Sequence, residues 1–295
     1  MRLKSALRRG VAAAVIAGIV VSSGIPAYAA RWNIADGDIT VRADDAEGKN
    51  RVSQGEKENV EDTDTVITGK SKEHTVTIDT SGGKVDVTFD DLKIDVSGKK
   101  EGDGSDDSPV DAGKAAVTVQ GGGDATIELD GDNKLKSGSG NAGLEKNKHE
   151  SKGTLTIKDD KGKDGSLTAE GGDDGAGIGG GIGSTGGSIT IRGGTIEAVG
   201  GSNAAGIGDG AGPWSEPDPD IPPSNPSNPN NIIICGDAEV TAKAGSQMTD
   251  AKAPAIGGKY GEVPTENLSD DEHKVTGGRL TRLNADGTVM EGMGY

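Results

Sequence analysis

Short segments in which apolar and polar residues alternate recur along most of the chain. Thr126–Leu129, Thr154–Ile157 and Ser188–Ile191 are of this kind, and Gly-rich stretches follow them. Alternation with a period of two sends one row of side chains inward and the next outward, which is typical of a half-buried β-strand. These segments carry no helical pattern, so the sequence predicts an all-β fold.

The alternating segments belong to an internal repeat, which is the strongest single feature of the sequence. Residues 167–181 are matched 29 residues later by 196–210; a third copy covers 240–258, and a weaker one covers 135–144. Each copy is interpreted as three short strands, of the types Ser/Thr-Ile-Thr-Ile, Thr-Ile-Glu-Ala and Ala-Gly-Ile-Gly. Glycine at the corners between them allows positive φ without a Cβ penalty.

A unit of about 30 residues with three short strands predicts one coil of a right-handed parallel β-helix. There are two alternatives. A β-sandwich predicts antiparallel hairpins rather than a fixed three-strand repeat. A flexible Gly-rich chain would not keep isoleucine at matching positions of successive copies.

The pattern divides the chain into a leader and three further parts. Residues 1–29 are predicted to be a signal peptide, and 30–64 an N-terminal strand or cap followed by a polar loop over 42–64. The parallel β-helix is expected over 65–262, with a Pro-rich insertion at 213–230. Residues 263–295 are expected to form a C-terminal strand hairpin and tail.

The predicted signal peptide rests on a cationic start, an apolar run and a small-residue cleavage motif. Arg2 and Arg8 precede the apolar run Val11–Val21, and Ala27 and Ala29 place the cleavage after residue 29. The alternative is a membrane anchor, but the run is shorter than the roughly 20 residues that span a bilayer. We therefore expect a secreted protein or one associated with the cell surface, without a membrane span after cleavage.

Composition alone indicates disorder, and the repeat changes that interpretation. Leu, Ile, Val and Phe total 53 of 295 residues, glycine contributes 51, and the net charge is −17. Such a chain has little apolar surface to offset its entropy. Stacked coils solve this problem because each coil buries its few aliphatic residues against its neighbours. The single cysteine, Cys235, lies in an apolar run and is expected to be buried as a small hydrophobic side chain.

The repeats resemble those of exported bacterial right-handed parallel β-helix proteins. They resemble in particular the carbohydrate-binding β-helix family of clostridial-type surface proteins, which is similar to pectate-lyase solenoids. The resemblance covers roughly residues 65–260 and is carried by 153–157, 165–169 and 187–198 together with the Ala-Gly-Ile-Gly pieces. It implies binding of an extracellular polysaccharide or a host or plant glycan.

Calcium is the one ion that the sequence brings into question, and no other cofactor is expected. Asp173, Asp174 and Asp209 lie at acidic corners, and calcium takes oxygen ligands from such clusters. The alternative is a solvated acidic loop, which we favour for any single cluster. The family that the chain resembles carries aspartate where this chain has Ala176 and Ala205, so a calcium site of the family type is in doubt.

Two aromatic residues in loop-like segments are candidates for contact with a sugar. Trp214 and Tyr260 are these residues, and a flat ring stacks on the C–H faces of sugars. The alternative for Trp214 is that it pins the insertion to the coil. The acidic chain is expected to bind no nucleic acid, because phosphates would repel it.

The function expected from the sequence is carbohydrate binding or adhesion without catalysis. One alternative is a structural surface stalk without a specific ligand, and a weaker one is a polysaccharide lyase-like enzyme. Catalytic carboxylate pairs cannot be singled out in so acidic a chain. No catalytic residue is therefore assigned.

Overall fold

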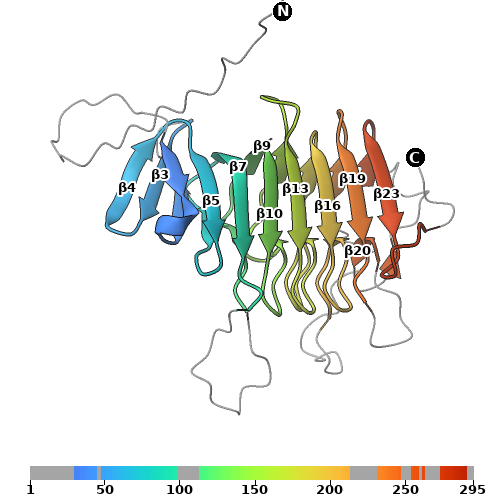
Figure 1. The fold of residues 1–295 in the computed structure, drawn as a ribbon. Coiled ribbons are helices and arrows are strands. Elements are labelled where there is room, and N and C mark those ends of the chain that lie inside the picture. Colours follow the sequence, from blue (N-terminus) through green and yellow to red (C-terminus); the bar gives the residue numbers. More distant parts are fainter. Residues whose placement is uncertain are drawn as a thin grey trace, which may run out of the picture.

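Parallel strands stacked in three rows make up most of the molecule (Figure 1). They belong to a thirteen-stranded and a ten-stranded sheet, and the one helix in the described part of the chain is a 3-10 turn, η1 (Ile34–Asp36). The predicted all-β class is confirmed. The computed structural model describes residues 30–44, 48–98, 113–212, 231–246, 254–258, 261–262 and 273–290.

The thirteen-stranded sheet divides into two arms that meet at the long strand β7 (Val85–Asp95). Its first half pairs with β9 and its last residues pair with β10, so a single strand begins both arms. The first arm contains β9 (Ala125–Asp130), β12 (Leu155–Lys158), β15 (Ile189–Ile191), β18 (Ile232–Ile234) and β22 (His273–Val275). The second arm contains β10 (Asp132–Lys136), β13 (Ser166–Glu170), β16 (Thr195–Val199), β19 (Glu239–Lys243) and β23 (Arg279–Leu283).

A third row of parallel strands lies in the ten-stranded sheet. In the central part of the stack, each passage of the chain adds one strand to the first arm, one to the second arm and one to the third row. The three-strand repeat predicted from the sequence is therefore present, and we call one such passage a coil. The third row contains β6 (Val76–Asp79), β8 (Val117–Gln120), β11 (Leu144–Glu145), β14 (Ile178–Gly179), β17 (Ile207–Gly208) and β20 (Ile256–Gly258), with β21 (Gly261–Glu262) antiparallel at its end.

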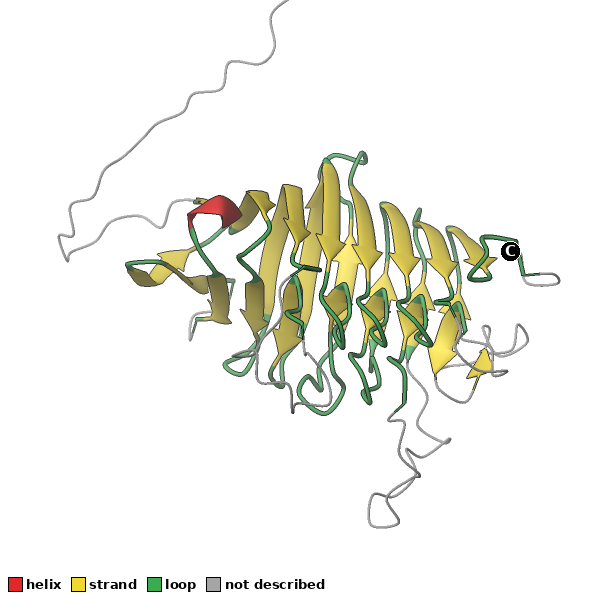
Figure 2. Cartoon of the chain, turned by 60° about the horizontal axis from the view of Figure 1, so that its bottom comes forward, coloured by secondary structure: helices red, strands yellow, loops and turns green. Residues whose placement is uncertain are grey.

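The N-terminal end of the stack carries a cap, beside the helical turn visible in Figure 2. The prediction of a polar loop over 42–64 was wrong for most of this segment, because β3 and β4 form an antiparallel hairpin on β2. The cap contains β1 (Arg31–Asn33), β2 (Ile39–Ala43), β3 (Asn50–Gln54) and β4 (Lys57–Asp62), and β5 (Val66–Ser71) joins it to β7.

The C-terminal end extends the stack beyond the boundary predicted at residue 262. Strands β22 and β23 pair in parallel with β18 and β19, so the first and second arms each gain one further strand. After β23 a turn brings Val289 antiparallel to Leu283. The predicted signal peptide at 1–29 and the Pro-rich insertion at 213–230 lie outside the described residues.

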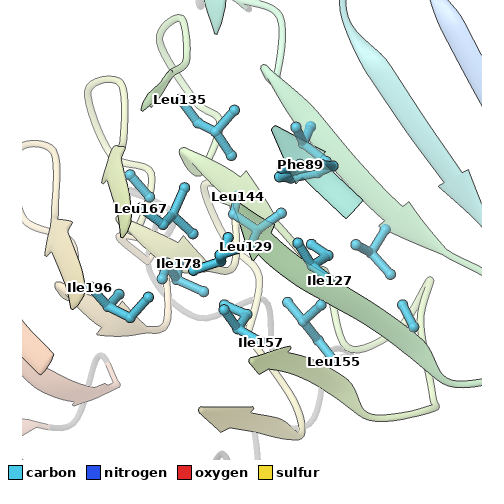
Figure 3. Close-up of a cluster of buried hydrophobic side chains, with 14 of the residues drawn as sticks. Phe89, Ile127, Leu129, Leu135, Leu144, Leu155, Ile157, Leu167, Ile178 and Ile196 are labelled. Atoms are coloured by element: carbon cyan, nitrogen blue, oxygen red, sulfur yellow. The ribbon is translucent and has the colours of Figure 1, made fainter. Parts of the chain in front are cut away.

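The core consists of aliphatic columns that run through the stack (Figure 3). In the first arm, pairing aligns Val87, Ile127, Ile157, Ile191 and Ile234, all of which are buried. Full burial of one such side chain stabilises the fold by roughly 1.5–3 kcal/mol. The columns explain how few aliphatic residues suffice, because a buried side chain in the interior of the stack packs between two neighbouring coils.

Candidate functional site

A polar cleft lies on the outer face of the first arm, next to the N-terminal cap. It has a volume of about 470 Å³, which is in the range of small-molecule sites. Its floor comes from β7, β9 and β12 and from Arg192, which directly follows β15. Its walls come from the cap and from the corner that follows β12. The described lining residues are Gly48, Asn50, Thr63, Asp64, Thr65, Lys84, Asp86, Val87, Thr88, Asp124, Thr126, Glu128, Thr156, Lys158, Lys161 and Arg192.

Strand register explains why the cleft floor is polar. The inward positions of these strands hold the core, so alternation leaves the outward positions to polar side chains. Pairing aligns Asp86 with Thr126 and Thr126 with Thr156, which gives one outward row across three strands. A second row aligns Thr88 with Glu128 and Glu128 with Lys158.

Opposite charges are balanced in the cleft, although the whole chain is strongly acidic. Its described lining has four carboxylates and four cationic groups. Three ion pairs join Lys84 to Asp86 at 2.9 Å, Lys158 to Glu128 at 2.9 Å, and Lys161 to Asp64 at 3.2 Å. The cleft therefore presents both hydrogen-bond donors and acceptors at fixed positions.

Two buried carboxylates hold the corner that carries Lys161. Glu128 Oε1 accepts hydrogen bonds from the backbone N–H groups of Asp160 and Lys161, both at 2.7 Å. Asp159 accepts from the N–H of Lys163 at 2.9 Å and from that of Gly165 at 3.0 Å. These bonds fix the corner, so the ammonium group of Lys161 is positioned over the cleft beside Asp64.

Lys158 contributes a stable positive charge to the cleft floor. Its hydrogen bond to Asp160, reinforced by Glu128, raises the pKa of the Lys158 ammonium group. The same hydrogen bond, aided by the charges of Lys158 and Arg192, holds the pKa of Asp160 below its usual value. Both groups therefore remain charged at neutral pH.

Several polar groups of the cleft are not used by the described part of the protein itself. The hydroxyls of Thr126 and Thr156 make no hydrogen bond to the described residues, and the exposed guanidinium of Arg192 makes neither a hydrogen bond nor an ion pair there. Asp124 accepts a bond from the N–H of Thr154 at 2.7 Å and makes no ion pair with a described residue. These groups can exchange water for a polar ligand without breaking an existing bond.

The aspartates that the sequence singled out for calcium lie elsewhere. Asp173 and Asp174 lie at the corner between β13 of the second arm and β14 of the third row, and Asp209 directly follows β17 of the third row. Asp173 Oδ1 accepts from Ser202 Oγ at 3.0 Å, and Asp174 Oδ1 accepts from Asn203 Nδ2 at 3.4 Å. Asp209 is buried, and its Oδ1 accepts from the Gly186 N–H at 3.2 Å.

These bonds assign the aspartates a role in joining neighbouring corners. Among the described residues no group of three or more His, Cys, Asp or Glu side chains is placed to hold a metal ion. Calcium binding at Asp173, Asp174 and Asp209 remains a prediction.

The remaining site predictions fall on residues outside the described part of the chain. Trp214 and Tyr260, predicted to contact a sugar, and Ala27 and Ala29, predicted to direct cleavage, all lie there. Cys235 is described, and it is half-buried rather than buried as expected, because it follows β18 at an outward position.

Sequence reasoning missed the cleft because it concentrated on the Gly-rich copies after residue 135. The signal was nevertheless present in the upstream strands. Their outward positions carry threonine and opposite charges, among them Asp86, Thr126, Glu128 and Lys158. Aligning these positions coil by coil would have placed the four residues on one face.

No protein-family model, curated protein or solved structure matches the chain. In the described part of the chain, no helix is both long enough and apolar enough to cross a membrane.

Proposed function

We propose that the protein is a secreted or cell-surface carbohydrate-binding protein, adhesive rather than catalytic, that binds an extracellular polysaccharide in the cleft of the first arm. Its scaffold in this proposal is a right-handed parallel β-helix. The parallel pairing of successive coils supports the scaffold. The hand follows from the general rule that crossovers between parallel strands of one sheet are right-handed in nearly all cases.

The cleft is the observation that carries this proposal. Sugars present many hydroxyls that both donate and accept, and they need a surface offering both kinds of partner. Thr126 and Thr156 supply hydroxyls that make no hydrogen bond to the described residues. Asp124 supplies a carboxylate, and Arg192 supplies a guanidinium that makes neither a hydrogen bond nor an ion pair to them. The described lining contains no aromatic residue, so recognition rests on hydrogen bonds unless Trp214 or Tyr260 adds a ring.

Charge favours a glycan over a nucleic acid. The net charge of −17 repels a phosphate backbone, whose binding depends on neutralisation by Lys and Arg. Secretion rests on the predicted signal peptide. It is tested by sequencing the N-terminus of the protein recovered outside the cell, which should begin at Ala30.

A glycan array probed with wild type and Arg192→Gln tests the proposed function. Losing a charged hydrogen bond costs about 1.5–3 kcal/mol, so the variant should bind the captured glycan at least about tenfold more weakly. Arg279→Gln is the matched control, because Arg279 is an exposed arginine on the second arm. Equal binding by all three proteins would exclude the cleft.

Two further outcomes address the alternatives to a binding function. A stalk without a specific ligand predicts no saturable binding to any glycan on the array. A lyase-like enzyme predicts turnover of pectin or another polyuronate, which appears as an unsaturated product with ultraviolet absorbance. Turnover would contradict the part of the proposal that excludes catalysis.

A further inference from the structure

A row of threonines continues from the cleft along the stack. Pairing aligns Thr126 with Thr156 and Thr156 with Thr190, and all three residues point outward and are half-buried. None of their hydroxyls makes a hydrogen bond to the described residues. Neighbouring strands are about 4.8 Å apart, so the hydroxyls form a row with that repeat. A pyranose unit in an extended glycan advances by a comparable distance.

The cleft is closed at the end that faces the cap. Asn50 stands against β7, with its Nδ2 donating to the Asp86 carbonyl at 2.7 Å and to Thr65 Oγ1 at 2.9 Å. The segment before β5 lies beside β7, because the Thr88 N–H donates to the Thr65 carbonyl at 2.8 Å. The ion pair between Asp64 and Lys161 completes this end.

The other end of the row has no such wall among the described residues. The residues that follow Thr190 and Arg192 in register are Ile233 and Cys235, and both are half-buried on the same outer face. The N–H of Cys235 donates to the Ile191 carbonyl at 2.9 Å, which fixes the backbone of Cys235 one coil beyond the cleft. The lone cysteine therefore lies beside the open end.

We infer that the cleft takes the end of an unbranched glycan, which runs along the stack axis over Thr126, Thr156 and Thr190 and leaves past Arg192 and Cys235. About one sugar unit lies over each coil. The cap stops the chain end at Asn50 and Asp64. This inference rests on the proposed function and specifies the shape and direction of its ligand.

Affinity as a function of oligosaccharide length tests the inference. The probes are linear size series, from monosaccharide to hexasaccharide, of chito-, xylo-, manno- and gluco-oligosaccharides and of oligogalacturonides. From β7 to the coil of Cys235 there are four strand spacings of about 4.8 Å, so affinity should rise up to about four units and then level off. Titration calorimetry measures each step.

A bulky label at Cys235 should reduce the number of sugar units over which affinity rises. After coupling of a polyethylene-glycol maleimide to the single thiol, the gain from the third and fourth units should disappear, while monosaccharide and disaccharide binding stays unchanged. Cys235→Ser treated with the same reagent is the control. Thr190→Val needs no labelling, and it should reduce the gain from the third unit about three- to tenfold.

The outcomes separate the inference from the proposed function. One outcome is that a series binds and that Arg192→Gln weakens the binding, while neither the label nor Thr190→Val changes the length dependence. In that case the glycan does not run along the threonine row, and the inference fails although the proposed function stands. If none of the series binds, the proposed function fails with it.

Discussion

At the scale of single residues, the most unusual feature is a buried pair of ionisable neighbours, Glu145 and Lys146. Glu145 aligns with Gly179 of the next coil, where the repeat has no side chain. Its carboxylate accepts from the Ala142 N–H at 3.0 Å and from Asn147 Nδ2 at 3.2 Å, and the Lys146 ammonium donates to the Ser151 carbonyl at 3.0 Å. Burial raises the pKa of Glu145 to about 7 and lowers the pKa of Lys146 to about 8.

Glu145 should make stability depend on pH in the acidic range. Its pKa in the folded state lies above the ordinary value of 4.5. Its stabilising contribution to the free energy of unfolding is therefore complete below about pH 4.5 and is lost as the pH rises through about 7. Glu145→Gln should remove this loss, which is on the order of 3 kcal/mol. Urea unfolding at about pH 5 and about pH 8 measures it.

The control for this prediction is Glu197→Gln, which alters an exposed glutamate on β16 and should leave the pH dependence as in wild type. Lys146 acts in the opposite sense. Because its pKa is lowered from the ordinary value of 10.5 to about 8, the free energy of unfolding decreases as the pH falls from the first value to the second. Unfolding free energies of wild type that do not change between the two pH values would contradict the burial of an ionisable Glu145.

Gly201 should not tolerate a side chain. A Cβ atom at this corner would overlap the carbonyl oxygen and carbon of Gly172 in the preceding coil. These two atoms belong to backbone that is held in place by the stack. Gly201→Ala should therefore destabilise the fold by about 1–3 kcal/mol or more. Gly122, whose Cβ would meet nothing within 4 Å, is the matched position, and Gly122→Ala should change stability by less than about 0.5 kcal/mol. Thermal unfolding of both variants measures the two losses of stability, and equal losses would contradict the close contact at Gly201.

At the scale of strands, alternation predicted most of the stack but failed where buried side chains are amides. In β3, the inward residues are Asn50, Val52 and Gln54, so the segment looks polar and was predicted to be a loop. Its amides are satisfied by fixed partners, with Gln54 Nε2 donating to the carbonyls of Asn33 at 2.6 Å and Gly37 at 3.0 Å. A hydrophobicity pattern does not reveal such partners.

The last strand shows the same limitation. Register places Arg282 in line with Ala242 and Ala198, and its side chain is fully buried at the C-terminal end of the core. An arginine at an inward position breaks the repeat pattern, so the sequence indicated that the repeat ended before it. The pairing of β23 with β19 shows that the stack continues.

Alternation within one strand gives a direct test of the inward and outward assignment. In β16, Ile196 is buried between Leu167 and Val240 of the neighbouring coils, while Glu197 is exposed. Ile196→Ala should cost about 2–5 kcal/mol of stability through lost burial and a cavity. Glu197→Ala, one residue away, should cost less than about 0.5 kcal/mol. Similar losses in both variants would contradict the register.

At the scale of the whole molecule, the sequence was sufficient for the three-strand repeat but not for the cleft. The repeat could be predicted because matching positions hold isoleucine or alanine in successive coils. The cleft could not, because its walls come from Asn50, Asp64 and Lys161, which are distant in sequence and carry no common motif. Only the stacking of the coils brings Asp64 to Lys161.

The same arrangement explains how an acidic, Gly-rich chain can offer a specific surface. One face of each strand supplies the core, and the opposite face supplies outward rows whose spacing is set by the backbone. On the first arm these rows hold balanced charges beside a closed end, together with hydroxyls that make no hydrogen bond to the described residues. The outward threonines of the second arm lie outside the cleft. We therefore expect glycan binding on the first arm alone.

The most direct test of this claim is calorimetric titration of a linear oligosaccharide that wild type binds into two double variants. Thr126→Val with Thr156→Val removes two cleft hydroxyls and keeps the β-branched shape, whereas Thr168→Val with Thr241→Val makes the same change on the second arm. The first pair should bind at least about tenfold more weakly, because two hydrogen bonds are lost, and the second pair should keep wild-type affinity. Unchanged affinity of the first pair, or equal loss in both, would contradict this claim.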